Sequence, residues 1–115
     1  MSNYDWVKVL EERTPTAKTE HKCKECFRII QPKEKYFLEK YIWEGAFYTH
    51  KTCKHCYEVR KFILFEYGEF LYSGLYEDLT NSSWGKKDWK PRLFAVGMSK
   101  KWRDKRGKLW KIIKN

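Results

Sequence analysis

Four cysteines are the residues of this chain most suited to chemistry, and they form two pairs. Cys23 pairs with Cys26 and Cys53 with Cys56, each with two residues between the cysteines, and 26 residues separate the pairs. A two-residue spacer lets both sulfurs of a pair turn toward one point, and two such pairs offer the four thiolates in a tetrahedron that Zn²⁺ prefers. The spacing predicts a structural zinc site made by all four cysteines.

Two other uses of paired cysteines fit this sequence less well. A redox Cys-x-x-Cys motif needs one pair on a βαβ scaffold and would leave the second pair unexplained. A disulfide framework belongs to exported proteins, and residues 1–6 lack the basic start and apolar stretch of a secretory signal. The longest nearly uncharged apolar stretch, residues 62–65, is too short to span a membrane. We therefore expect a cytoplasmic protein that binds zinc.

His50 leaves a second ligand set open, because His50 and Cys53 are also separated by two residues. Both ligand sets occur in zinc sites. Thiolate is the stronger ligand for this borderline-soft ion, and Cys56 would otherwise be an unexplained thiol beside the metal. We expect four cysteine ligands, with His50 and His55 next to them or on the surface. A zinc ion with four sulfur ligands has no open position for water, which argues against metal catalysis.

The residues around the cysteine pairs predict the elements that position them. Residues 35–50 are rich in strand-forming side chains around a glycine-containing turn, which predicts a β-hairpin. From Cys53 no Gly or Pro follows until Gly68, and apolar residues recur every three or four positions, so the second pair is expected to open a helix. Thr52 is expected to cap this helix, and residues 73–74 to end it.

Weaker patterns complete the first 85 residues. Residues 6–10 are expected to form an edge strand, and 14–16 a linker into the first cysteine pair. Residues 75–79 have the composition of a short helical turn. Residues 81–85 read as a loop between the cysteine-containing part and the C-terminal segment.

The cysteine-containing part resembles a known family. The segments C-K-E-C-F-R-I-I-Q-P-K-E-K-Y at 23–36, W-E-G-A-F at 43–47 and K-T-C-K-H-C at 51–56 resemble small treble-clef zinc proteins common in bacteriophage and prophage genomes. The likeness covers about residues 20–60. It is also distantly similar to half of a LIM module, although no Cys or His follows Cys56 to make the second zinc site of that module. The resemblance implies an α+β fold of knuckle, hairpin and helix, a phage origin and no specific activity.

Positive charge is concentrated at the C-terminal end. The chain carries a net charge of +10, and residues 81–115, with 12 Lys and Arg against two Asp, carry a charge equal to all of it. Residues 81–115 also contain four of the six tryptophans. The chain is therefore expected to divide into a treble-clef core with an N-terminal strand, residues 1–80, and a basic segment packed on it, residues 81–115.

Nucleic acid is the partner that this basic segment predicts. Cations interleaved with aromatic rings suit a phosphate backbone and exposed bases. The candidate contacts are Lys86, Lys87, Lys90, Arg92, Lys100, Lys101, Trp102, Arg103, Lys105 and Arg106. Two alternatives stay open, because tryptophans in small domains are often core residues and a basic face can be merely solvated or meet an acidic protein.

Two structures fit residues 99–113. A hairpin would turn at 104–107, with Gly107 supplying a positive φ. A helix from Ser99 would place Gly107 in its interior at a cost of about 1 kcal/mol. We expect the hairpin, packed on the helix that follows Cys53, because that helix is apolar on too much of its circumference to be covered on one side.

The expected function is that of a non-catalytic, phage-encoded, zinc-stabilised accessory or regulatory protein that binds DNA or RNA. The alternative is a phage factor that docks on and inhibits or redirects a host enzyme, such as RNA polymerase or a defence nuclease. A nuclease of the His-Asn-His type is not expected. His50 could supply the first His and Asn81 the Asn, but no His follows Asn81.

Overall fold

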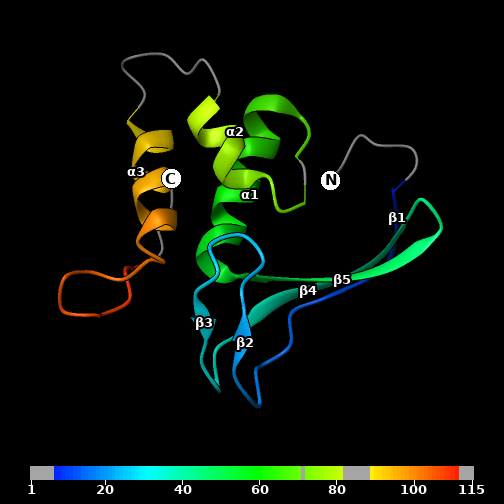
Figure 1. The fold of residues 1–115 in the computed structure, drawn as a ribbon, viewed down its shortest axis with the longest axis horizontal. Helices are drawn as coiled ribbons and strands as arrows, with labels where there is room; N and C mark the ends of the chain where they lie inside the picture. The colour runs from blue at the N-terminus through cyan, green and yellow to red at the C-terminus, as the bar shows by residue number, and fades with distance from the viewer. Residues whose placement is uncertain (1–6, 71, 82–88, 112–115) are drawn as a thin grey trace.

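A three-stranded antiparallel sheet, a two-stranded hairpin and three helices make up the α+β fold (Figure 1). The computed structural model describes residues 7–70, 72–81 and 89–111. In chain order the elements are β1 (Val7–Arg13), β2 (His21–Lys22), β3 (Ile29–Ile30), β4 (Tyr36–Trp43), β5 (Ala46–Cys53), α1 (Lys54–Tyr67), α2 (Leu75–Asn81) and α3 (Lys90–Ser99). None of the helices in these ranges is long and apolar enough to cross a membrane.

The sheet confirms the predicted hairpin and edge strand. Its order is β1-β4-β5, so β1 lies at one edge beside the β4–β5 hairpin. The hairpin turns through Glu44 and Gly45, whose φ angles of 49° and 78° are those of a tight turn that matches the twist of its strands. The register pairs Tyr36 with Cys53, so the far end of β5 brings that cysteine back toward the first cysteine pair.

Helix α1 follows β5 directly, as the apolar spacing predicts, but its ends differ from the expected ones. Cys53, and not Thr52, is the N-cap, and its sulfur accepts a hydrogen bond from the backbone N–H of Cys56. Thr52 instead accepts a hydrogen bond from Arg60. The helix ends at Gly68, whose φ of 80° and N–H bond to the Leu64 carbonyl close the last turn, so the predicted end at 73–74 is wrong.

The C-terminal segment contains a helix that the sequence pattern did not predict. Helix α3 begins at Lys90, with a proline in its first turn, and is followed by a turn at 104–107. Gly107 has a φ of 79°, which confirms the predicted turn. The predicted strands on either side of it do not form, because only Arg103 and Leu109 pair, as an isolated bridge. The predicted helical turn at 75–79 is confirmed as α2. Of the predicted loop at 81–85, Asn81 instead belongs to α2, and residues 82–85 lie outside the described residues.

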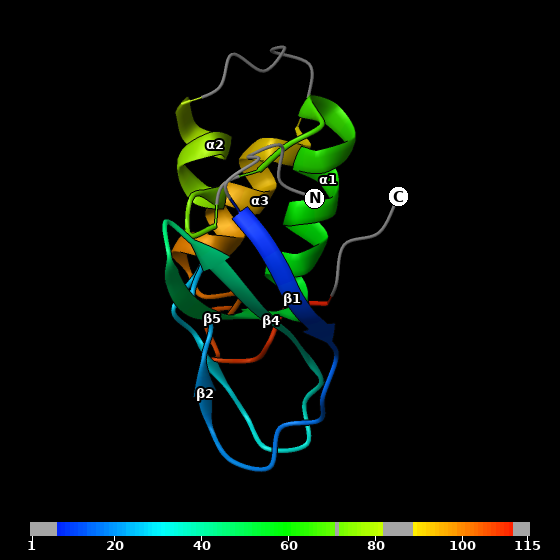
Figure 2. The same ribbon diagram turned by 90° about the vertical axis from the view of Figure 1, so that its right-hand side faces the viewer.

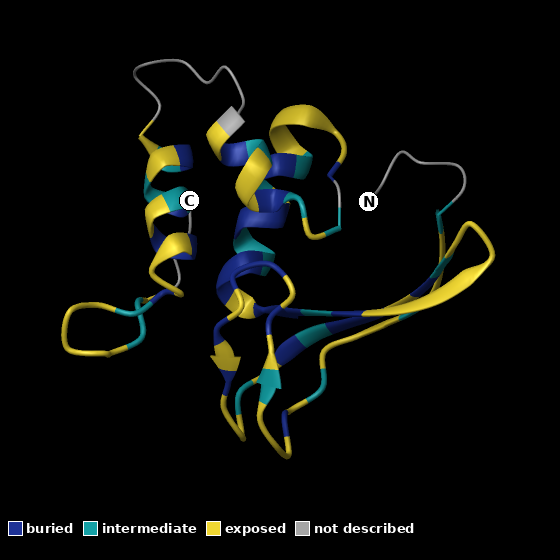
Figure 3. Cartoon of the chain, viewed as in Figure 1, coloured by how far each residue is buried: buried dark blue, intermediate teal, exposed yellow. Residues whose placement is uncertain are grey.

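One hydrophobic cluster joins the two halves of the chain. It extends from Ala17 through the four cysteines to residues of α2, α3 and finally Trp102. Figure 2 shows the three helices grouped beside the sheet. The far end of β4 and β5 and the loop after α3 are exposed, as Figure 3 shows. The C-terminal segment is thus part of the core that surrounds the cysteines.

Candidate metal centre and basic surface

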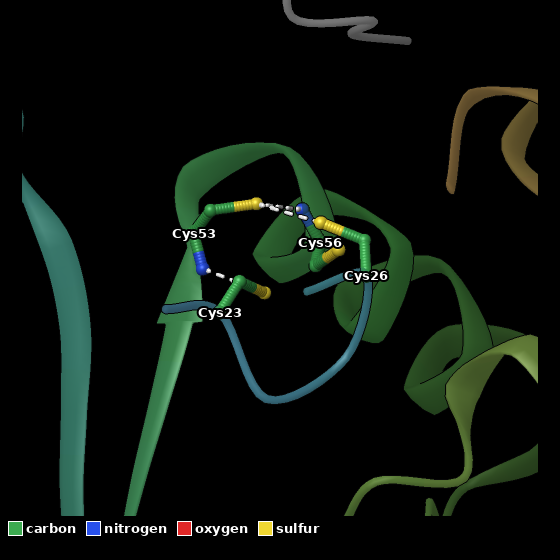
Figure 4. A group of neighbouring side chains, drawn as sticks. All are labelled: Cys23, Cys26, Cys53 and Cys56. Atoms are coloured by element: carbon green, nitrogen blue, oxygen red, sulfur yellow. Dashed lines mark hydrogen bonds between the residues drawn. The ribbon is translucent and has the colours of Figure 1, made fainter. Parts of the chain in front are cut away.

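The four cysteines meet at one point in the fold, as their spacing predicts. Cys23 and Cys26 lie in the turn between β2 and β3, Cys53 ends β5, and Cys56 lies in the first turn of α1 (Figure 4). Their sulfurs all lie within 4.8 Å of one another, and no cysteine is more than 5% exposed.

These distances fit a bound zinc ion. Four sulfurs at about 2.3 Å from a tetrahedral ion lie about 3.8 Å from one another, and the sulfurs of Cys26 and Cys53 are 3.8 Å apart. A disulfide would need a separation of about 2.05 Å, and all four cysteines are free. The cluster therefore has the donor set and the spacing of a four-sulfur metal site, and zinc is the ion that such a set favours.

The turn that carries the first cysteine pair is shaped by its backbone. The N–H of Cys23 donates to the Arg28 carbonyl at 3.0 Å, and the N–H of Phe27 donates to the Cys23 carbonyl at 3.0 Å. Phe27 has a φ of 66°, the left-handed conformation that lets the chain reverse just after Cys26. Both cysteine side chains thus point to the same side of the turn, toward β5 and α1.

Several N–H groups point at the sulfurs and would stabilise negative charge on them. The backbone N–H groups of Glu25 and Cys53 donate to the Cys23 sulfur at 3.4 Å and 3.3 Å. Hydrogen bonds from the other thiols, led by that of Cys26, hold the pKa of Cys23 well below its usual range. Burial raises the pKa of Cys56. Without a cation one sulfur can ionise at the expense of its neighbours, whereas a divalent ion allows all four to do so.

Trp102 contacts the cysteine cluster and is buried, so its ring is not exposed for the nucleic-acid contact that the sequence predicts. It is only 1% exposed, and its indole N–H donates to the Cys56 sulfur at 3.3 Å. The ring stacks on His55 at 5.1 Å between centroids and covers Gly97 of α3. Lys101 and Trp102 have φ angles of 55° and 60°, so two consecutive residues adopt a left-handed conformation where the chain turns into the core.

His50 and His55, the two histidines near the cysteines, form hydrogen bonds with other groups. The fold therefore assembles the four cysteines and not the alternative ligand set with His50. The Nε2 of His50 bonds to the Glu25 carboxylate at 2.9 Å. The same carboxylate accepts the N–H groups of Ser73 and Leu75 and so holds the start of α2. The Nε2–H of His55 donates to the Trp110 carbonyl at 2.6 Å, and burial lowers the pKa of His55.

Glu25 and Trp102 are the two contributors to this centre that sequence reasoning missed. Glu25 lies between the first two cysteines, and this position is the only feature of the sequence that places it near the cluster. Trp102 is 46 residues from the sulfur to which it donates, and no local pattern indicates such a contact.

The remaining basic candidates divide by burial. Arg92, Lys100, Lys101, Lys105 and Arg106 are exposed, Lys90 and Arg103 are half-buried, and Lys86 and Lys87 lie outside the described residues. The exposed cations after α3 lie on a loop that projects from the body of the molecule (Figure 1). Asp104 is the one acidic residue of this loop, and it accepts the backbone N–H groups of Arg106 and Lys108.

No family model, curated protein or solved structure matches this chain. The class of protein is therefore defined by its own geometry. It is a small α+β protein with four buried cysteines at metal-ligand distance.

Proposed function

We propose that this protein is a non-catalytic, zinc-stabilised nucleic-acid-binding accessory or regulatory protein. Zn²⁺ would be bound by Cys23, Cys26, Cys53 and Cys56. The loop at residues 100–108, which we name the basic loop, would contact the phosphates of DNA or RNA.

The observation that carries this proposal is the composition and anchoring of the basic loop. It holds six Lys and Arg against one Asp. The loop is fixed at its base, because Trp102 is buried against the Cys56 sulfur and the Trp110 N–H donates to the Trp102 carbonyl at 2.7 Å. A fixed group of cations loses less conformational freedom on binding than a mobile one. Each contact with a phosphate releases condensed counterions, which supplies sequence-independent affinity.

We assign the scaffold to the treble-clef class, with a phage origin, as part of the same proposal. The order of a cysteine-bearing turn, a β-hairpin that ends at Cys53 and a helix that carries Cys56 in its first turn supports the class. The resemblance of residues 20–60 to phage proteins is the basis for the origin. The absence of catalysis is proposed because four sulfurs fill the coordination of zinc, and because His50 and His55 are buried and already hydrogen-bonded.

A second candidate function is docking on a host protein, and one observation favours it. Apolar side chains are exposed on one face of the sheet, at the end farthest from the cysteines (Figure 3). Trp43 and Tyr48 are 38% and 40% exposed there and their rings lie 6.1 Å apart. Val9, which is 38% exposed, lies on the same face because it pairs with Tyr41, the partner of Tyr48 in β5. Exposed apolar patches of this kind commonly mark protein–protein contacts.

A salt titration of the zinc-loaded protein separates the two functions. Duplex DNA, single-stranded DNA and RNA of equal length would each be titrated by fluorescence anisotropy at several salt concentrations. Nucleic-acid binding predicts that log affinity falls linearly with log salt, with a slope of about −0.9 per phosphate contacted on duplex DNA. Absence of binding to all three at physiological salt would contradict it and leave protein docking.

A charge-matched pair of variants localises the binding. The first replaces five cations of the basic loop by Gln, at Lys100, Lys101, Arg103, Lys105 and Arg106. The control replaces five exposed lysines of the N-terminal part by Gln, at Lys8, Lys18, Lys22, Lys33 and Lys35. The loop variant should lose affinity and flatten the salt slope much more than the control. Equal losses would show that net charge alone, and not the basic loop, determines binding.

A further inference from the structure

The outer face of α3 carries an exposed tryptophan beside cations. Trp89, directly before the helix, is 61% exposed, and Val96, two turns on, is 44% exposed. Together with Arg92 and Leu93 they line a shallow hollow of about 350 Å³. The opposite face of the helix is buried, so the hollow faces away from the core.

The segment that carries this hollow is strongly basic and favours an anionic ligand. The described part of the C-terminal segment, residues 89–111, contains nine Lys and Arg and one Asp. That single acid, Asp104, already accepts two backbone N–H groups. The ligand must therefore combine negative charge with a flat apolar surface that covers the indole ring of Trp89.

The spacing of side chains along α3 suits an extended ligand chain in which negative charges and flat rings alternate. Residues 89, 93, 96 and 100 fall on one side of a helix, so Lys100 lies on the same side as Trp89. The rise of a helix puts these two residues about 16 Å apart. A ligand chain that follows this face would therefore contact the ring of Trp89 first, then Arg92, and then the cations of the basic loop.

We infer that the outer face of α3 is a binding site for single-stranded nucleic acid, with Trp89 as the platform on which an unpaired base stacks. This inference rests on the proposed function and adds to it a preference for single strands. Bases of a duplex are stacked on one another and cannot cover a surface tryptophan without unpairing, whereas unpaired bases stack on aromatic side chains regardless of sequence. Arg92 contacts the adjacent phosphate.

The test compares a single-stranded 12-mer of thymidines with a 12-bp duplex, each bound to the zinc-loaded protein. Replacing Trp89→Leu removes the ring but keeps an apolar side chain, and should weaken single-strand binding about 5- to 160-fold, the range for loss of one stacked base. Duplex affinity should stay within about twofold. Trp89→Phe should restore most of the single-strand affinity. Phe65→Leu, at an exposed aromatic residue of α1, is the matched control and should change neither.

Arg92→Gln gives a second readout that does not involve the ring. It should lower the magnitude of the single-strand salt slope by about 0.7, the value for one phosphate. Unchanged single-strand affinity in Trp89→Leu overturns the stacking site, and the proposed function stands if the basic-loop variant still loses binding. Equal losses on single strands and duplex in Trp89→Leu also overturn it. If the unaltered protein binds no nucleic acid, the proposed function fails and this inference fails with it.

Discussion

Gly97 lies where α3 meets the ring of Trp102, and replacing it by alanine tests whether that ring packs directly on the backbone of the helix. A Cβ at position 97 would lie 2.2 Å from Cζ3 and 2.4 Å from Cε3 of Trp102, closer than the 3.0 Å below which real Cβ contacts essentially never occur. The ring is buried and its N–H donates to the Cys56 sulfur. It cannot move aside without weakening that hydrogen bond.

Two opposing effects set the magnitude for Gly97→Ala. In the interior of a helix, alanine is favoured over glycine by about 1 kcal/mol. Overpacking a buried site costs about 1–3 kcal/mol, and loss of the hydrogen bond to sulfur adds about 1 kcal/mol. The net expectation is a decrease of roughly 1–3 kcal/mol in the free energy of unfolding. For a chain of this size that lowers Tm by roughly 5–15 °C.

Thermal unfolding of the zinc-loaded protein, followed by circular dichroism, measures this decrease. Ser99→Ala, an exposed change at the end of the same helix, serves as the control. In a Trp102→Leu background the clash is absent, so Gly97→Ala should there be neutral or stabilising, and the double-mutant cycle isolates the contact. Stabilisation by Gly97→Ala in the original chain, or an equal loss in both backgrounds, would show that the ring of Trp102 does not determine the cost of a side chain at position 97.

Two further predictions concern ion pairs made by buried arginines. Arg60→Met should lower the free energy of unfolding by about 3–5 kcal/mol in a denaturant titration, because Arg60 pairs with buried Glu39 at 2.7 Å; a loss below 1 kcal/mol would contradict this. Burial alone would raise the pKa of Glu34, but hydrogen bonds from Arg28 outweigh it and keep that pKa below its usual value. Ionised Glu34 therefore stabilises the fold above the ordinary carboxyl pKa, and this stabilisation is lost as pH falls. Glu34→Gln should lower the free energy of unfolding at pH 7 and reduce its dependence on pH in the acid range. Parallel stability curves would disprove that contribution.

The elements around the cysteines could be predicted because their signals are local. Two-residue spacers, the turn at Glu44 and Gly45, and an apolar spacing uninterrupted as far as Gly68 each specify nearby backbone. The position of the N-cap differed by one residue, because the sulfur of Cys53 takes the part that a hydroxyl usually plays.

The contacts that join the C-terminal segment to this core could not be predicted in the same way. Helix α3 was missed because Gly97 interrupts its apolar face, and the reason for that glycine, the ring of Trp102, lies beyond the end of the helix. Trp102 was expected on the surface because basic residues surround it in sequence. Its burial depends on a sulfur 46 residues away, and such long-range pairing leaves no periodic signal.

X-ray absorption at the zinc edge, on protein purified without added chelator, tests the central proposal most directly. The structure brings together four sulfurs from Cys23, Cys26, Cys53 and Cys56, all within 4.8 Å of one another. We predict one zinc ion per chain with four sulfur neighbours at about 2.3 Å. A nitrogen or oxygen neighbour in place of a sulfur, or a folded protein that holds no zinc, would contradict it.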